Sequence, residues 1–288
     1  MRLIARSISR AARTTLQRQW FSAHVLAVFD QACDLATPEG DVVALVSPSV
    51  GDGPLSVVVQ AEPGEPAADR GALPGTPAWL DGDTLHVGSL EVALGEAPVW
   101  EPCPNWSAHR ARLPIIMTGL PELRAIAQGH APAGSLLTDL DTADAHVVQP
   151  TLAVRPGSEA KNLRLGWAGD LACLREAAAQ LAGRGIGLTP SGDDFLGGLM
   201  LWAWLAHPAP GPFCRTLAEV AGLRTTTLSA AFLRAAARGQ CDANWHRLLA
   251  ALSAGGVAQL APAVQQVVAH GATSGADMLA GFLWLAAG

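Results

Sequence analysis

A short motif containing serine and aspartate occurs twice in the C-terminal part of the chain. The first copy is Gly187-Leu188-Thr189-Pro190-Ser191-Gly192-Asp193-Asp194, continuing to Gly198, and the second runs from Gly271 through Thr273-Ser274-Gly275-Ala276-Asp277 to Gly281. Serine, glycine, aspartate, leucine and glycine recur at the same relative positions, and Pro190 is the one extra residue. Hydroxyl and carboxylate groups delivered together by a glycine-containing turn are suited to binding a small polar ligand.

Helix capping is the simpler interpretation of both copies, because each precedes a dense apolar run typical of a buried helix. Ser191 would be the N-cap and Asp194 the N3 residue, and Ser274 and Asp277 would take the same places, which is close to a capping box. Each cap would contribute roughly 1 kcal/mol. Gly198 and Gly281 lie one turn beyond the aspartates, where they would let another backbone approach closely.

Two features of the first copy go beyond capping. Gly183, Gly185 and Gly187 precede it, and a glycine-rich loop before a helix can present free N–H groups to an anion. Asp193 is not needed for a cap, and two adjacent carboxylates repel each other unless a donor or a cation meets them. A ligand with an anionic end and an N–H-rich end, such as a ureide or carbamoyl compound, would satisfy both features, as would an anion bridged by Mg²⁺. The pattern is neither a dinucleotide fingerprint nor a P-loop, because an alanine-rich helix precedes it and no Lys-Ser/Thr pair follows.

A third polar cluster, Arg224-Thr225-Thr226-Thr227-Leu228-Ser229, stands at the start of another expected helix. Thr226 and Ser229 are three residues apart and share a face, with Thr225 beside them. Capping and hydroxyl bonds to the preceding turn are the alternative to a binding role. His270 adjoins the second motif, where we interpret it as an incidental loop residue, and the residues alone identify no nucleophile.

Composition excludes several classes of protein. Of the 288 residues, 50% are apolar and 15% are charged, which predicts a compact globule rather than a disordered segment. The net charge of −6 gives no reason to expect a nucleic acid partner. The five cysteines are far apart and form no C-x-x-C, which argues against a disulfide framework and favours a reducing cytoplasm. The apolar runs 195–206 and 278–287 are too short to span a bilayer, so we expect no membrane partner.

The sequence pattern of the N-terminal part predicts antiparallel β structure. Short β-branched or alternating segments, punctuated by Gly, Pro and Asp, cover Val42–Val46, Leu55–Val59, Thr84–Val87 and Leu90–Leu94. Residues 20–35 carry apolar residues at helical or mixed spacing. The first 29 residues contain five arginines and no acid, as in some transit peptides, but without a visible cleavage site we favour an ordinary first helix or strand.

Helical patterns begin near Leu113, where Pro121 would open a turn running to Gln128, and residues 130–165 are not assigned. We therefore predict an α+β protein with a β-rich N-terminal domain, residues 1–112, and a mainly helical domain, residues 113–288, that carries the repeated turns. The expected helices are Asp170–Ala182, Ser191–Ala206, Phe213–Ala221, Thr225–Ala237, Asp242–Leu252, Val257–Val268 and Ser274–Ala286.

Taken together, the three motifs resemble the AllH family in order and spacing, most strongly over residues 185–285. That family includes a subunit of the bacterial oxamate carbamoyltransferase of allantoin degradation. The resemblance implies a cytoplasmic component of ureide nitrogen catabolism, acting with other subunits in carbamoyl transfer between oxamate and phosphate through oxalurate and carbamoyl phosphate. Relatives usually carry histidine where this chain has Ala272, so either the activity is lost or His270 substitutes.

We predict one ligand site where the two turns come together, with no cofactor assigned and Mg²⁺ as the metal these groups could hold. Asp193, Asp194 and Asp277 would be catalytic, accepting ureide N–H groups. The alternatives are a non-catalytic assembly subunit and an Asp- and metal-dependent amide hydrolase. The expected substrate-binding residues are Gly187, Thr189, Ser191, Gly192, Thr225, Thr226, Ser229, Thr273, Ser274 and Gly275.

Overall fold

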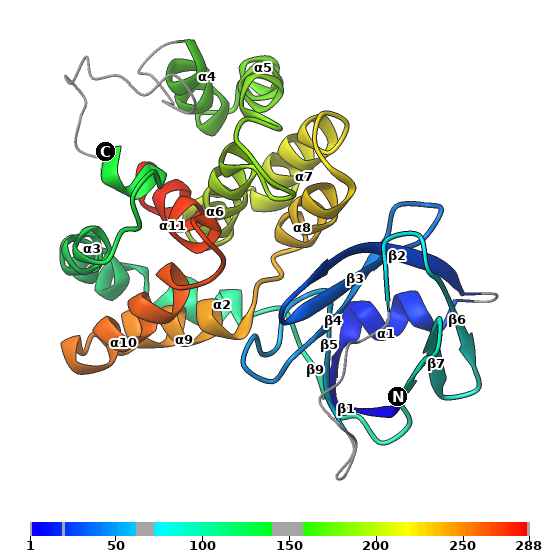
Figure 1. Ribbon diagram of the computed structural model, residues 1–288. Coiled ribbons are helices and arrows are strands. Elements are labelled where there is room, and N and C mark those ends of the chain that lie inside the picture. Colours follow the sequence, from blue (N-terminus) through cyan, green and yellow to red (C-terminus); the bar gives the residue numbers. More distant parts are fainter. Residues whose placement is uncertain (1, 19–20, 62–71, 140–157, 287–288) are drawn as a thin grey trace. The chain divides into compact units, whose positions relative to one another are not determined.

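The computed structural model describes residues 2–18, 21–61, 72–139 and 158–286. The chain divides into two compact units, Met1–Pro102 and Cys103–Gly288. The first unit is built of strands around one short helix, and the second is built of helices (Figure 1). The α+β prediction, with β structure first and helices after it, is confirmed.

The strands of the first unit form one sheet that closes into a barrel. Eight strands follow the order β5-β4-β3-β2-β6-β7-β8-β1, and β1 pairs back with β5. The short strand β9 pairs with the last two residues of β1, beyond β8. The strands are β1 (Arg2–Ser9), β2 (Ser22–Phe29), β3 (Ala32–Ala36), β4 (Val42–Val46), β5 (Ser56–Ala61), β6 (Pro77–Asp81), β7 (Thr84–Val87), β8 (Leu90–Ala93) and β9 (Val99–Trp100).

The prediction of an antiparallel region holds for only part of the sheet. Hairpin neighbours such as β2–β3 and β6–β7 are antiparallel, but β1–β8, β1–β9 and β4–β5 are parallel pairs. Two of the three parallel pairs arise because β1, at the start of the chain, lies beside strands that come much later, whereas β4 and β5 are consecutive strands. Local turn signals predict hairpins well, but they carry no information on such long-range pairing.

Residues 22–36 form a hairpin rather than a helix. In β2, Ala23, Val25 and Ala27 are buried and alternate with more exposed residues, which is the period of a half-buried strand. Two of these three residues are alanines, so the alternation is weak in the sequence. The arginine-rich start forms β1 and then the helix α1 (Arg10–Leu16), whose buried Ala12 and Leu16 join the barrel core.

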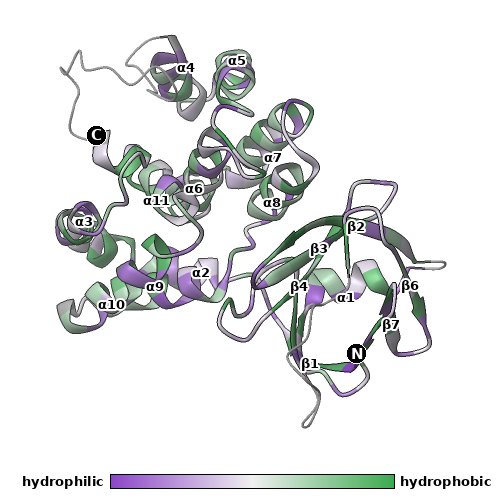
Figure 2. Ribbon diagram, in the orientation of Figure 1, coloured by the Kyte–Doolittle hydropathy of each residue, from purple (hydrophilic) through white to green (hydrophobic). Residues whose placement is uncertain are grey.

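The apolar core of the barrel follows from its strand sequences. Figure 2 shows long apolar stretches along these strands. Leu35, Val43, Leu45, Val57 and Leu85 are at most 1% exposed and belong to one cluster. β-branched and leucine residues at alternating positions fill such an interior efficiently.

The second unit contains every helix predicted after residue 169, and about half of the predicted helix ends are shifted, by one to three residues. It begins with α2 (Trp106–Ala111) and α3 (Leu113–Gly129), a single helix that runs through Pro121 instead of starting there. The later elements are η1 (Leu136–Asp139), α4 (Ser158–Trp167), α5 (Leu171–Leu181), α6 (Ser191–Ala206), α7 (Pro210–Ala221), α8 (Thr227–Ala237), α9 (Ala243–Ala254), α10 (Val257–Val268) and α11 (Ser274–Trp284).

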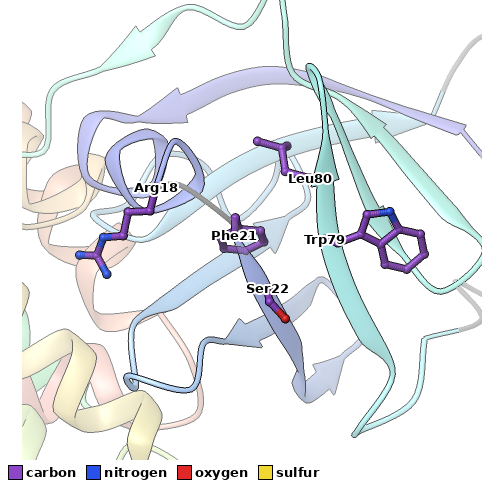
Figure 3. A pocket seen from close by; sticks show the side chains of 5 residues that line it. All are labelled: Arg18, Phe21, Ser22, Trp79 and Leu80. Carbon is purple, nitrogen blue, oxygen red and sulfur yellow. The ribbon is translucent and has the colours of Figure 1, made fainter.

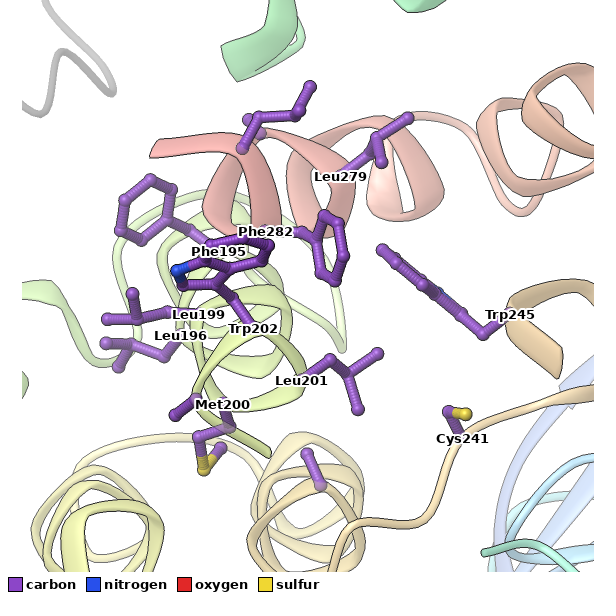
Figure 4. Packing of buried hydrophobic residues seen from close by; sticks show 14 of the residues in the cluster. Phe195, Leu196, Leu199, Met200, Leu201, Trp202, Cys241, Trp245, Leu279 and Phe282 are labelled. Atoms are coloured by element: carbon purple, nitrogen blue, oxygen red, sulfur yellow. The ribbon is translucent and has the colours of Figure 1, made fainter. Parts of the chain in front are cut away.

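Helix α6 lies at the centre of the helical unit. It is buried on nearly every side, and Figure 4 shows Phe195, Leu199 and Trp202 packed among the residues of neighbouring helices. Phe282 of α11 packs edge-on against Trp202, with ring centroids 5.3 Å apart. Because α6 and α11 form the core, the turns that begin them are fixed in position. Across the described residues, no helix combines the length and apolar character needed to cross a membrane.

Candidate functional site

The two repeated motifs meet in space because the helices they begin cross at glycines. A methyl group on Gly198 of α6 would lie 1.7 Å from the carbonyl oxygen of Met278, and one on Gly281 of α11 would lie 1.9 Å from that of Phe195. Gly198 corresponds to Gly281 in the repeat, and Phe195 corresponds to Met278. The contact is therefore reciprocal, as it would be about an approximate two-fold axis. The expectation that these glycines admit a neighbouring backbone is confirmed.

The glycine that follows each serine also has a packing role. A methyl group on Gly192 would lie 2.2 Å from the carbonyl oxygen of Leu181, at the end of α5. The equivalent group on Gly275 would lie 1.8 Å from that of Val267, near the end of α10. The unit α5–α6 is thus repeated by α10–α11, with each helix pair held together at the same motif position.

Hydroxyl groups connect the two turns directly. Thr189 Oγ1 and Ser274 Oγ lie 2.9 Å apart, which is a hydrogen bond between the first motif and the second. Burial raises the pKa of Asp194 and of Asp277, and hydrogen bonds from the hydroxyls of Ser274 and Ser191, respectively, offset part of this increase. Each serine therefore forms a hydrogen bond with the aspartate of the other copy. Thr273 acts within its own copy, where its hydroxyl also lowers the pKa of Asp277.

The prediction that Ser191 and Ser274 cap their helices is wrong. Both serines are the first residues of α6 and α11, and the N-cap residues are Pro190 and Thr273. Among the described residues, neither N-cap residue makes a side-chain hydrogen bond that caps its helix. The backbone satisfies the first turn of α6 itself, since the N–H groups of Asp193 and Asp194 donate to Pro190 O at 2.9 and 3.1 Å. The side chains are thereby left for other partners.

Asp193 joins three segments of the helical unit. Its Oδ1 accepts a hydrogen bond from the Gly183 N–H at 3.0 Å, and its Oδ2 accepts from Ser229 Oγ at 2.9 Å and from Thr225 Oγ1. Burial raises the pKa of Asp193, and these three donors lower it in part. With its acceptors occupied and its side chain 2% exposed, Asp193 holds the 183–190 loop against the start of α8.

The residues of the third polar cluster, Arg224 to Ser229, include one that caps α8 and two that bind Asp193. Thr226 is the N-cap of α8, and its Oγ1 accepts from the Ser229 N–H at 3.0 Å and donates to Leu188 O at 2.5 Å. Thr225 and Ser229 instead donate to Asp193. The same cluster therefore starts a helix and supplies hydroxyl donors to the buried carboxyl group of Asp193 in the first motif.

Asp194 and Asp277 differ from Asp193 because each keeps an oxygen without a partner. Asp277 is fully buried, and its Oδ1 accepts from the Leu136 N–H at 2.6 Å. The Oδ2 atoms of both Asp194 and Asp277 are buried and lack a hydrogen-bond partner among the described residues. Burial raises the pKa of both, and for Asp194 the negative charges of Asp277 and Asp193 raise it further.

Several backbone N–H groups of the two turns already have partners within the protein. The Gly192 N–H donates to Arg184 O at 2.9 Å, and the Gly275 N–H donates to His270 O at 3.0 Å. Gly187 has a φ of +88°, which favours glycine, and nothing lies within 4 Å of where its side chain would be. The region is thus richer in acceptors than in donors, and it favours the N–H-rich end of a ligand over its anionic end.

Two residues of this region, Leu136 and Ser135, were not predicted from the sequence, because they lie in the unassigned stretch 130–165. Leu136 supplies the N–H that binds Asp277, and the preceding residue, Ser135, is 2% exposed with a buried hydroxyl that has no partner among the described residues. A backbone donor leaves no mark in the residue type. Gly134-Ser135 in front of an apolar pair was the only available signal, and it is common in loops.

No metal site is evident in the part of the chain that the structure describes, since it contains no group of three or more His, Cys, Asp and Glu side chains arranged to hold an ion.

A separate pocket of about 450 Å³ lies in the barrel unit, lined by Arg18, Phe21, Ser22, Trp79 and Leu80 (Figure 3). Another, of about 430 Å³, adjoins the second turn at Gly271 and Ala272. Its lining includes His130, whose Nε2 lies 3.0 Å from Gln265 Nε2.

The fold and the site define a barrel-plus-helices protein whose helical unit carries a duplicated turn with buried carboxylates. Residues 4–99 match the model of the AllH family N-terminal domain, and residues 181–286 match that of the oxamate carbamoyltransferase subunit AllH. The chain therefore belongs to the AllH family. No solved structure matches the chain.

Proposed function

We propose that the chain is a subunit of an oxamate carbamoyltransferase and that its paired turns bind the carbamoyl substrate. The family to which it belongs is that of a carbamoyltransferase subunit. The observation that carries the proposal for the site is the reciprocal meeting of the two motifs, which brings Asp194 and Asp277 together beside the hydroxyls of Ser191, Thr189 and Ser274.

In the proposed reaction, the bond between the carbamoyl carbon and the amide nitrogen of oxalurate breaks. A bond from that carbon to a phosphate oxygen forms, and the nitrogen takes the proton of hydrogen phosphate, which leaves oxamate and carbamoyl phosphate. Acceptors fixed in a buried site would orient the reacting amide, and fixed dipoles of this kind can contribute several kcal/mol to a barrier. We place this activity in the cytoplasm, in ureide and allantoin nitrogen catabolism, within a hetero-oligomer.

The test is activity of the assembled enzyme. The full chain is co-purified with the other subunits, and carbamoyl phosphate formed from oxalurate and phosphate is measured. We expect Asp277→Asn to lower the rate at least about tenfold, the size expected for one weakened hydrogen bond to a charged group. Asp242→Asn is the matched control, because Asp242 caps α9 through Asn244 and Trp245 and asparagine caps equally well.

A non-catalytic assembly subunit is the alternative. In that case the complex would require the chain, but Asp277→Asn and Asp242→Asn would be equally active. An Asp- and metal-dependent hydrolase has no support in the side-chain arrangement of the described residues.

A further inference from the structure

Three buried polar atoms around the second turn have no partner among the described residues. They are Oδ2 of Asp194, Oδ2 of Asp277 and the hydroxyl oxygen of Ser135. Buried polar atoms in folded proteins are almost always hydrogen-bonded, because leaving one unpaired costs the full desolvation penalty of the group. A cluster of such atoms at the meeting point of two motifs is therefore expected to have a ligand as its partner.

The residues that carry these atoms are connected through Asp277. Asp194 and Asp277 lie close enough for the charge of one to raise the pKa of the other. Ser135 directly precedes Leu136, whose N–H donates to Oδ1 of the same Asp277. The third carboxylate, Asp193, is excluded from this set, because its oxygens already accept three hydrogen bonds.

The chemistry of the three atoms selects a kind of ligand. Two carboxyl oxygens are acceptors and the hydroxyl can donate, which is the complement of a primary carboxamide with two N–H groups and one carbonyl oxygen. Asp277 Oδ1 already accepts an N–H group, so Oδ2 of this residue is an acceptor only while the group is ionised. Burial and the charge of Asp277 favour the protonated form of Asp194, and a proton on Oδ1 of Asp194 would leave its Oδ2 as an acceptor. A neutral donor is thus a better match than a cation, which would require both groups to be ionised.

We propose that Asp194 and Asp277 bind the –NH2 group of a primary carboxamide through their unpartnered Oδ2 atoms, while the Ser135 hydroxyl donates to its carbonyl oxygen. This assignment rests on the proposed function and narrows it. Oxamate carries such a group, and so does the carbamoyl end of oxalurate. The site would select for the unsubstituted –NH2 and against a carboxylate in the same place.

Calorimetric titration of the full chain with three probes tests the assignment. Oxamate carries the –NH2 group, N,N-dimethyloxamate has the same charge without N–H groups, and oxalate replaces the amide by a carboxylate. We expect oxamate to bind at least about tenfold more tightly than either analogue, because a site built to pair N–H groups rejects ligands that lack them. Asp194→Asn and Asp277→Asn should each weaken oxamate about tenfold or more, and Asp242→Asn should not.

Thermal unfolding of the same variants separates binding from folding. Replacing a buried carboxyl group that has one unpartnered oxygen by a neutral amide, which keeps the other oxygen as an acceptor, should leave the melting temperature unchanged or raise it. Weaker binding would then not reflect a damaged fold. Equal affinity for the three probes, or oxamate binding that is insensitive to both substitutions, would overturn the carboxamide assignment and leave the proposed function standing. Failure of all three probes to bind would contradict the ligand site itself.

Discussion

At the scale of residues, three aspartates that look alike in the sequence have different roles. Asp193 accepts hydrogen bonds from Gly183, Thr225 and Ser229, so it ties together segments that are distant in the chain. Asp194 and Asp277 each keep a buried oxygen free of partners among the described residues. The second motif has Ala276 where the first has Asp193, which agrees with a tethering role needed only in the first copy.

We expect Asp193→Ala to lower the free energy of unfolding by about 3 kcal/mol, because it leaves a backbone N–H and two hydroxyls without their acceptor in a buried place. Asp193→Asn keeps an acceptor oxygen, so its free energy of unfolding should fall by less. Chemical denaturation of the full chain measures both variants. A loss below about 0.5 kcal/mol for Asp193→Ala, the range of ordinary surface substitutions, would show that the network does not stabilise the fold.

At the scale of elements, the crossing of α6 and α11 determines the site. Glycines at equivalent positions allow the backbones to approach, and the serine and aspartate of each turn then reach the other copy. Neither helix could provide the arrangement alone. The paired helices are also the most apolar part of the helical core, so the polar groups lie at the ends of a rigid scaffold.

Substitution of neighbouring glycines in α6 tests this crossing. Gly198→Ala should destabilise the protein by several kcal/mol, because its new methyl group would overlap backbone atoms of α11 that cannot move away independently. Gly197→Ala is the matched control. Its methyl group would meet only the Met278 side chain, at 3.6 Å, and alanine favours a helix over glycine by about 1 kcal/mol.

Denaturant unfolding of the two variants gives the comparison. Similar stabilities for Gly197→Ala and Gly198→Ala would contradict close backbone packing between α6 and α11. Because the glycine contacts are reciprocal, Gly281→Ala should reproduce the Gly198→Ala loss, since its methyl group would lie 1.9 Å from Phe195 O.

At the scale of the whole molecule, each unit contains its own hydrophobic core. Leu85 belongs to the barrel cluster and Leu199 to the helical cluster, and both are fully buried. A unit with its own core can unfold as a separate cooperative transition. The candidate site lies within the helical unit, so we expect it to be lost when the helical unit unfolds.

Leu199→Ala should lower the stability of the helical transition by about 2–5 kcal/mol, the usual cost of truncating a buried leucine. Leu85→Ala should leave that transition unchanged, since distant substitutions without shared partners act independently. Circular dichroism at 222 nm during denaturation follows mainly the helical unit. If Leu85→Ala shifted the denaturation midpoint of this signal as much as Leu199→Ala does, the two units would unfold as one.

Local physics was sufficient for much of the fold. The strands Val42–Val46 and Thr84–Val87 and the helix Ser191–Ala206 were predicted with the bounds that the structure gives them, because β-branched runs, alanine-rich segments and glycine punctuation act over a few residues. The hairpin at residues 22–36 was missed, since small alanines carry its alternation. The parallel pairs of β1 were missed because nothing near a strand specifies a partner far along the chain.

The sequence by itself determined the family, the succession of a β-rich part and a helical part, and the repeat that marks the site, since each of these depends on residue types at fixed spacing. Only the tertiary structure decided which aspartate is a tether and which keep unpaired oxygens, because those roles depend on donors from Gly183, Thr225, Ser229 and Leu136. Hydrogen-bond partners that folding brings together, including backbone N–H groups of any residue type, are not encoded in a motif.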